Sequence, residues 1–234
     1  MLIQIVVLIQ PVPDLSKASV SKSQALLIEK GPRVMNPADR NALEFALQIK
    51  EKAAEWKATG GQVEITTLML APSESEGILK ETLALEADRA VILSDAAFLA
   101  GDGTAAASAL GQAAAKLKAD LVLCGEGAMG HRVAEEMNLP SVHSISGISF
   151  DQGALKLLSK KQNGEEMINV SPPLLASVIA GSNTPRIANA IKIMKAAKKE
   201  ILRWSPADLG LTADKVGSGA SGMERVRSFT PDST

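Results

Sequence analysis

Short apolar runs alternate with longer amphipathic runs over the first 125 residues, and this alternation limits the possible folds more than any other feature. The apolar runs are LIQIVVLI (2–9), VEITTLML (63–70), RAVILS (89–94) and DLVLCG (120–125). They are continuous rather than alternating in polarity, as in strands that are buried on both faces. We therefore expect an α/β fold, built from right-handed βαβ units, with a doubly wound, mostly parallel sheet and helices on both faces.

The helices expected between these strands cover residues 37–58, 74–85 and 102–118. The first has a clear start, because Asn36 is a favoured cap residue and Pro37 suits the first helical position, where no N–H is needed. Residues 11–34 interrupt the pattern. Two proline-marked turns surround the apolar run ALLIE there, which predicts a hairpin or an irregular excursion.

The pattern loosens after Gly130, where one helix is expected over about 131–138. Short strand-like runs follow near 142–150, 154–158, 166–170 and 174–180. A basic amphipathic segment, IANAIKIMKAAKKEILRW, precedes a tail rich in Gly, Ser and Thr. We expect one α/β domain over residues 1–204 and a C-terminal arm over 205–234 that is ordered, if at all, by a partner.

Composition argues against several classes of function. Lys plus Arg (25) nearly cancels Asp plus Glu (26), so no global field favours nucleic acid or an anionic membrane. Four Phe, two Trp and no Tyr provide few platforms for stacking bases. No apolar run reaches the roughly 18 residues of a membrane-spanning helix, and a single cysteine fits a reducing compartment. We expect a cytoplasmic protein without membrane insertion.

A glycine-rich loop follows the fourth expected strand. Residues 125–130 read Gly-Glu-Gly-Ala-Met-Gly, which satisfies G-x-G-x-x-G between a strand and a helix, where backbone amides can approach a phosphate. Asp151 lies 21 residues after Gly130, near the distance expected of a ribose-binding acid. However, the loop does not follow the first strand, and Asp151 sits in what reads as a hairpin turn. A nicotinamide site, a phosphate loop of another geometry and a plain tight turn all stay open.

Other polar residues give weaker signals. Asp102 or Thr104 could cap the Ala-rich helix or meet a ligand at the sheet edge. Cys124 is most simply a small buried side chain, and a pairing with His131 lacks an orienting third group. No P-loop motif or metal-ligand spacing occurs. The basic stripe of Lys192, Lys195, Lys198, Lys199 and Arg203 is either a solvated helix face or a docking surface for an acidic partner.

Taken together, short motifs along the whole chain resemble the β subunit of electron transfer flavoproteins, including nitrogen-fixation-associated and bifurcating members. These motifs are Gln10-Pro11-Val12-Pro13-Asp14, Asn36-Pro37-Ala38-Asp39 with Ala42-Leu43-Glu44-Phe45-Ala46-Leu47, Glu86-Ala87-Asp88-Arg89-Ala90, Leu123-Cys124-Gly125, Pro185-Arg186, Ile193-Met194-Lys195-Ala196 and Phe229-Thr230-Pro231. The resemblance implies a sheet of the adenine nucleotide alpha hydrolase type. It also implies a heterodimer with an α subunit that holds most of the electron-carrying FAD, while the β chain holds AMP or, in bifurcating members, a second FAD.

The resemblance also indicates which residues of this chain would contact the nucleotide and which would contact the redox partner. The family's β-chain nucleotide would lie against Ile9, Gln10, Asn36, Leu70, Ala71, Thr104, Gly125, Gly127 and Gly130. The family's loop carries an acidic run and a Gln-Thr-Gly that this chain lacks, which argues against a second FAD and leaves AMP possible. In the family's partner-recognition loop, a Leu-Pro is replaced here by Ala190 and Ile191, followed by Lys192 and Lys195, so redox-partner docking is expected to differ.

The function implied is that of a non-catalytic electron-carrier subunit, which passes electrons between a flavoprotein dehydrogenase and a downstream acceptor. The alternative is an adenine-nucleotide-binding regulatory module that has lost flavin service. A third interpretation, a nicotinamide-dependent oxidoreductase, depends on the glycine loop alone.

Overall fold

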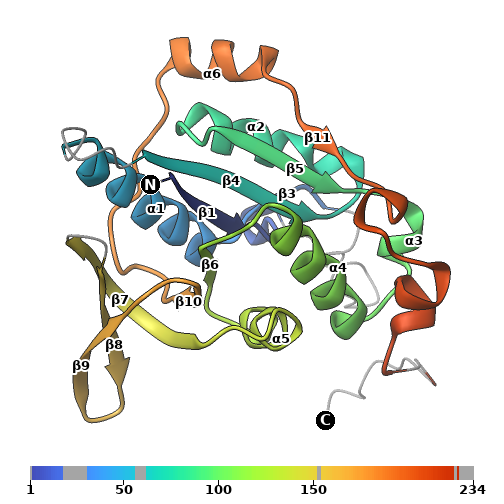
Figure 1. Cartoon of the computed structure of the whole chain (residues 1–234). Helices are drawn as coiled ribbons and strands as arrows, with labels where there is room; N and C mark the ends of the chain where they lie inside the picture. The colour runs from blue at the N-terminus through green and yellow to red at the C-terminus, as the bar shows by residue number, and fades with distance from the viewer. Residues whose placement is uncertain (1, 18–30, 56–61, 152–153, 224–225, 227–234) are drawn as a thin grey trace, which may run out of the picture.

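The computed structural model describes residues 2–17, 31–55, 62–151, 154–223 and 226. Its main sheet has nine strands in the order β11-β5-β4-β1-β6-β10-β7-β8-β9 (Figure 1). These strands are β1 (Leu2–Leu8), β4 (Gln62–Leu70), β5 (Arg89–Leu93), β6 (Leu121–Gly125), β7 (Ser141–Asp151), β8 (Ala154–Lys161), β9 (Gly164–Val170), β10 (Leu174–Val178) and β11 (Leu202–Arg203). A separate antiparallel pair joins β2 (Pro11–Pro13) to β3 (Arg33–Met35).

The strand order confirms a doubly wound, mostly parallel α/β sheet. Every neighbouring pair from β11 to β7 is parallel, and only β8 and β9 run antiparallel, as an extension at one end of the sheet. From β1 the chain moves outward to β4 and β5, and it then returns to place β6 on the opposite side of β1. The direction of winding therefore reverses between β1 and β6, where open α/β sheets commonly bind ligands at their carboxyl edge.

Helices cover both faces of the sheet, as Figure 1 shows. They are α1 (Pro37–Glu55), α2 (Glu76–Ala84), α3 (Ala96–Leu99), α4 (Gly103–Lys116), α5 (Ala128–Glu136) and α6 (Ala190–Lys198). Side chains of α1, α2 and α6 join one buried cluster, and those of α3, α4 and α5 join the other. Within β1, Ile5 and Val7 face the first cluster while Val6 and Leu8 face the second, which explains why this strand is continuously apolar.

The predicted element boundaries differ from the structure mainly at the ends. The helix expected over 37–58 is described only to Glu55, since 56–61 lie outside the described residues. The helix expected over 131–138 begins earlier, at Ala128, because Gly127 serves as its cap. Within 11–34, β2 and β3 form the expected hairpin-like pair, and the run ALLIE lies outside the described residues. The patterning did not predict the short elements α3 and β11.

Short 3₁₀ turns connect several elements. They are Leu15–Lys17, Ser73–Ser75, Ala207–Leu209, Ala213–Lys215 and Gly217–Ala220. No helix within the described residues is long and apolar enough to cross a membrane.

Much of the predicted C-terminal arm contacts the chain itself. Val216 is buried in the second cluster, and Lys116 of α4 donates a hydrogen bond to the carbonyl oxygen of Asp208. One Asp102 oxygen caps the start of α4, and the other accepts N–H hydrogen bonds from Gly222 and Met223, each at 3.0 Å. These contacts hold the segment from Asp208 to Met223 against α4 of the same chain. Packing of the arm on another subunit stays a prediction.

Candidate functional site

A cavity of about 400 Å³ opens where the winding of the sheet reverses. We call it the switch-point cavity. Five of the predicted nucleotide contacts line it: Ile9, Gln10, Leu70, Gly125 and Gly127. These residues come from the carboxyl ends of β1, β4 and β6 and from the loop that opens α5. Its volume lies in the range of small-molecule sites, about 300–1,000 Å³.

Four other predicted contacts lie outside the lining of this cavity. Asn36 supports it indirectly, because its N–H donates to the carbonyl oxygen of Gln10 at 3.1 Å while its side chain accepts from Ala38 N at the start of α1. Ala71 is buried and donates its N–H to Leu93. Thr104 lies in the first turn of α4, close to the fastened residue Gly222.

Gly130, the fourth, has a packing role. A Cβ atom at this position would lie 2.7 Å from the Cys124 sulfur, so the absence of a side chain lets α5 approach β6. Burial, followed by the charge of Asp39, raises the pKa of the Cys124 thiol well above its usual range. This placement fits a small buried side chain at Cys124 rather than a nucleophile.

The other two glycines of the loop shape the cavity wall. Gly127 has φ = +152°, a conformation that favours glycine, and a Cβ there would meet no atom within 4 Å. At Gly125, by contrast, a Cβ would lie 2.6 Å from Asp39 Oδ1 and 2.7 Å from Ala38 Cβ. The end of β6 therefore touches the start of α1, and only glycine fits there.

Asp39 is a cavity residue that sequence reasoning did not select. It is 3% exposed, and its carboxylate accepts the N–H of Gln10 at 2.7 Å and the N–H of Gly125 at 2.6 Å. It thus ties the ends of β1 and β6 together across the switch point. Burial raises the pKa of Asp39 to about 7, although these two hydrogen bonds oppose the change. The available signal was the Asn-Pro-x-Asp motif at the start of the first helix.

Arg132 of α5 is a second polar residue of the cavity lining that the sequence analysis did not predict. Its guanidinium lies so close to Gly103 that a Cβ there would overlap it. Arg132 therefore reaches from the second turn of α5 to the first turn of α4. Sequence reasoning gave no signal for it, because Gly103 and Arg132 are distant in the chain.

Comparison with known proteins gives this site a family context. The model of the electron transfer flavoprotein domain matches residues 24–209. The chain belongs to the electron transfer flavoprotein family. Electron transfer flavoprotein subunit beta of Thermoanaerobacterium thermosaccharolyticum is 33% identical, over 97% of this chain and 88% of that protein. Subunit CarD of the caffeyl-CoA reductase-Etf complex of Acetobacterium woodii is 31% identical, over 97% and 88%, and protein FixA of Sinorhizobium fredii is 29% identical, over 97% and 83%.

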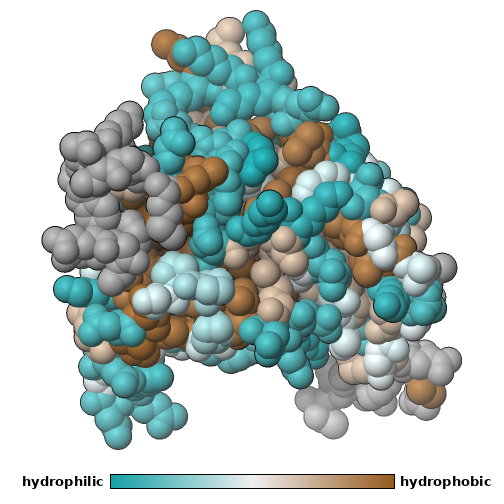
Figure 2. Space-filling view, viewed as in Figure 1, coloured by the Kyte–Doolittle hydropathy of each residue, from teal (hydrophilic) through white to brown (hydrophobic). Residues whose placement is uncertain are grey.

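Within this electron transfer flavoprotein chain, the predicted docking residues lie on α6. Ala190 is its first residue, Ile191 is 65% exposed, and Lys195 projects from an exposed position. Lys192 instead forms an ion pair with Glu86 at 2.9 Å. Exposed apolar side chains lie beside the lysines in α6 and just before it: Ile187, Ile191, Ile193 and Met194. Figure 2 shows apolar and hydrophilic surface side by side over α6, at the top of the view.

A charge cluster holds the segment that leads into α6. Arg186 donates two side-chain hydrogen bonds of 2.9 Å to Glu44 and one of 2.6 Å to Glu51, so it fastens this segment to α1. The side chain of Asn41 also donates to the side-chain oxygen of Asn183 at 2.6 Å. The Pro-Arg motif thus has a structural role in positioning α6.

The two histidines lie beside the glycine loop. The rings of His131 and His143 stack with centroids 3.5 Å apart, and His143 hydrogen-bonds to Ser177 at 3.0 Å and to Ser141 at 2.8 Å. Burial, then the charges of His131 and Lys161, lowers the pKa of His143. His131 therefore stacks on His143 instead of pairing with Cys124. Asp151 lies at the end of β7, opposite Ala154 in the hairpin.

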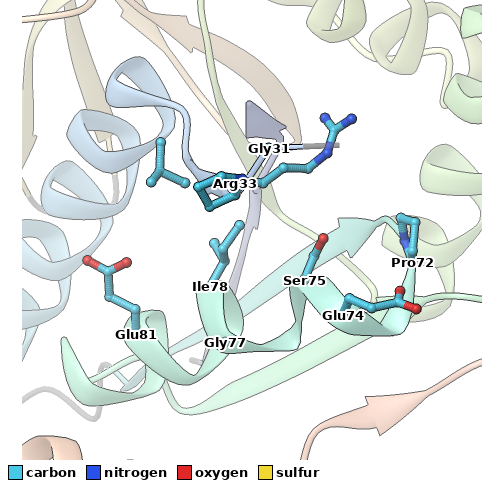
Figure 3. A pocket seen from close by; sticks show the side chains of 10 residues that line it. Gly31, Arg33, Pro72, Glu74, Ser75, Gly77, Ile78 and Glu81 are labelled. Atoms are coloured by element: carbon cyan, nitrogen blue, oxygen red, sulfur yellow. The ribbon is translucent and has the colours of Figure 1, made fainter. Parts of the chain in front are cut away.

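A second pocket, of about 550 Å³, lies between α2 and the segment that enters β3. Ile78 and Glu81 of α2, and Ser75 just before this helix, line one side of it, and Gly31 and Arg33 lie on the other side (Figure 3). It contains none of the predicted site residues and carries charges of both signs. The switch-point cavity is therefore the better candidate site.

Proposed function

We propose that this chain is the β subunit of an electron transfer flavoprotein that pairs with an FAD-bearing α subunit. The complex would carry electrons between a flavoprotein dehydrogenase and a downstream acceptor in the cytoplasm. The observation that carries this proposal is the similarity to β subunits over 97% of the chain. In this role the protein positions cofactors and partners, and the flavin performs the redox chemistry. The chain is then an electron carrier and not an enzyme by itself.

We further propose that the switch-point cavity holds AMP rather than a second FAD. A volume of about 400 Å³ suits one mononucleotide, whereas a dinucleotide needs more room. The cavity is walled by aliphatic side chains such as Ile9 and Leu70, and by the bare backbone around Gly127. Such a wall suits a flat base, and backbone amides at the start of α5 suit a phosphate.

Cofactor content tests the proposed function. The chain is co-expressed with an α-type subunit, and FAD, AMP and NAD are extracted and quantified per heterodimer. We expect one FAD and one AMP. Two FAD would contradict our assignment of the cavity. A failure to form any complex or retain flavin would overturn the electron-transfer role and favour the nucleotide-binding regulatory module.

The α6 surface is proposed to dock the redox partner. Exposed apolar anchors surrounded by charge commonly dominate such interfaces, so Ile191→Asp is expected to weaken dehydrogenase binding by about tenfold or more. Lys195→Glu should mainly slow association, with an effect that shrinks at high salt. Both are measured as the rate at which the reduced dehydrogenase reduces the heterodimer.

The matched control is Lys160→Glu, which makes the same charge change on β8, an element of the antiparallel extension. It should leave the rate unchanged. Equal effects of Lys160→Glu and Lys195→Glu would show that only the overall charge matters, and would contradict docking at α6.

A further inference from the structure

We infer that Arg132 is the phosphate-binding side chain of the switch-point cavity, and that the cavity consequently selects a nucleoside monophosphate over the uncharged nucleoside. This inference rests on the proposed nucleotide-binding function and assigns its anion-binding residue. Three observations carry it: the position of Arg132, its lack of an acceptor in the described residues, and the arrangement of the neighbouring acids.

Arg132 is placed to reach a ligand from the α5 side. It lies at the start of the second turn of α5, lines the cavity, and is only partly exposed. Its guanidinium crosses Gly103 at the first turn of α4. A ligand between the ends of β1, β6 and α4 would therefore meet this cation.

Arg132 differs from four other arginines of the described residues in its lack of an acceptor there. Arg40, Arg89, Arg186 and Arg203 each form an ion pair with a glutamate. Among the described residues, Arg132 forms no ion pair and donates no hydrogen bond. A guanidinium has five donors in a planar fork that matches a phosphate in two-point geometry. A partly buried fork with no acceptor, facing a cavity, is thus suited to an anionic ligand.

The acids of the cavity do not neutralise this cation. Both oxygens of Asp39 accept backbone hydrogen bonds, and they lie at the junction of β1 and β6. Glu126 also lines the cavity, but its carboxylate accepts a hydrogen bond from Ser144 of β7 at 3.2 Å and forms no ion pair with Arg132. The base would lie against the aliphatic wall, and the phosphate would lie between Arg132 and the amides that open α5.

The test compares binding of AMP and adenosine by isothermal titration calorimetry on the purified full chain, after removal of any retained nucleotide. Arg132→Gln should weaken AMP binding about 10- to 100-fold, because a charge-assisted two-point contact is lost, and should leave adenosine binding unchanged. Arg132→Lys should restore part of the affinity, since it keeps the charge but not the fork. Glu126→Gln should strengthen AMP binding modestly by removing a nearby negative charge.

Arg33→Gln is the matched control, because Arg33 is an exposed arginine that lines the second pocket and is not among the described residues around the switch-point cavity, and it should change neither affinity. Equal losses of AMP and adenosine affinity in Arg132→Gln would assign Arg132 a structural role and overturn the inference, as would unchanged AMP binding. If the wild type binds neither ligand, the nucleotide assignment fails together with this inference. The electron-transfer role is then judged separately, by whether the heterodimer retains FAD.

Discussion

Replacing Gly125 by alanine is expected to destabilise the chain by about 2–3 kcal/mol, as overpacking at a close contact typically does. The added Cβ would lie 2.6 Å from Asp39 Oδ1, 2.7 Å from Ala38 Cβ and 2.8 Å from Asp39 N. Ala38 Cβ and the backbone N of Asp39 are fixed by the backbone of α1, so these two atoms cannot rotate away from the new side chain. Relief requires β6 and α1 to separate, which also stretches the hydrogen bond from Gly125 N to Asp39. The measurement is the free energy of unfolding in urea.

Gly77→Ala provides the control for this prediction. Gly77 lies in the first turn of α2, and a Cβ there would meet nothing within 4 Å. This substitution should be neutral or stabilising by up to about 1 kcal/mol, because alanine favours the helix. Equal effects of the two substitutions on unfolding would contradict the close contact between β6 and α1.

The strands and the cavity loop could be predicted because their signals are local. Sheet strands covered on both faces need continuous apolar runs, and β1, β4, β5 and β6 each have one. The loop at Gly125 and Gly127 carries a recognisable spacing between a strand and a helix. Pattern and structure therefore agree where one segment determines its own conformation.

Asp39 and Arg132 were missed because their roles arise only from tertiary contacts. The carboxylate of Asp39 accepts a hydrogen bond from the N–H of Gly125, which is 86 residues away in the chain. The guanidinium of Arg132 in α5 lies against Gly103 in α4. Strand β11 has only two residues and forms through pairing with β5, so its own sequence carries little signal. The resemblance places Gly130 beside the nucleotide, and the structure packs this glycine against Cys124, a contact that the glycine spacing alone does not predict.

The second large effect concerns the pH dependence of stability. Burial raises the pKa of Asp39 to about 7 in the folded chain, whereas the free carboxyl titrates near 3.8. Between these values the folded state binds the additional proton, so the free energy of unfolding falls as pH rises through this window. Above about pH 7 both states are ionised, and the contribution becomes constant. A shift of this size corresponds to a loss of about 2–4 kcal/mol between pH 4 and pH 7.5.

Asp39→Asn separates this titration from that of all other groups. The amide has one oxygen to offer, so one of the two N–H groups of Gln10 and Gly125 loses its acceptor, at a cost of about 1–3 kcal/mol that does not depend on pH. Because the other carboxylates titrate in both proteins, the difference in unfolding free energy between wild type and variant isolates Asp39. We expect the wild-type advantage to be largest near pH 4.5 and to shrink steadily by pH 7.5, in urea unfolding at four pH values. An advantage that instead grows with pH would mean that the hydrogen bonds to the carboxylate outweigh its desolvation, and that the folded chain holds Asp39 ionised across the whole range.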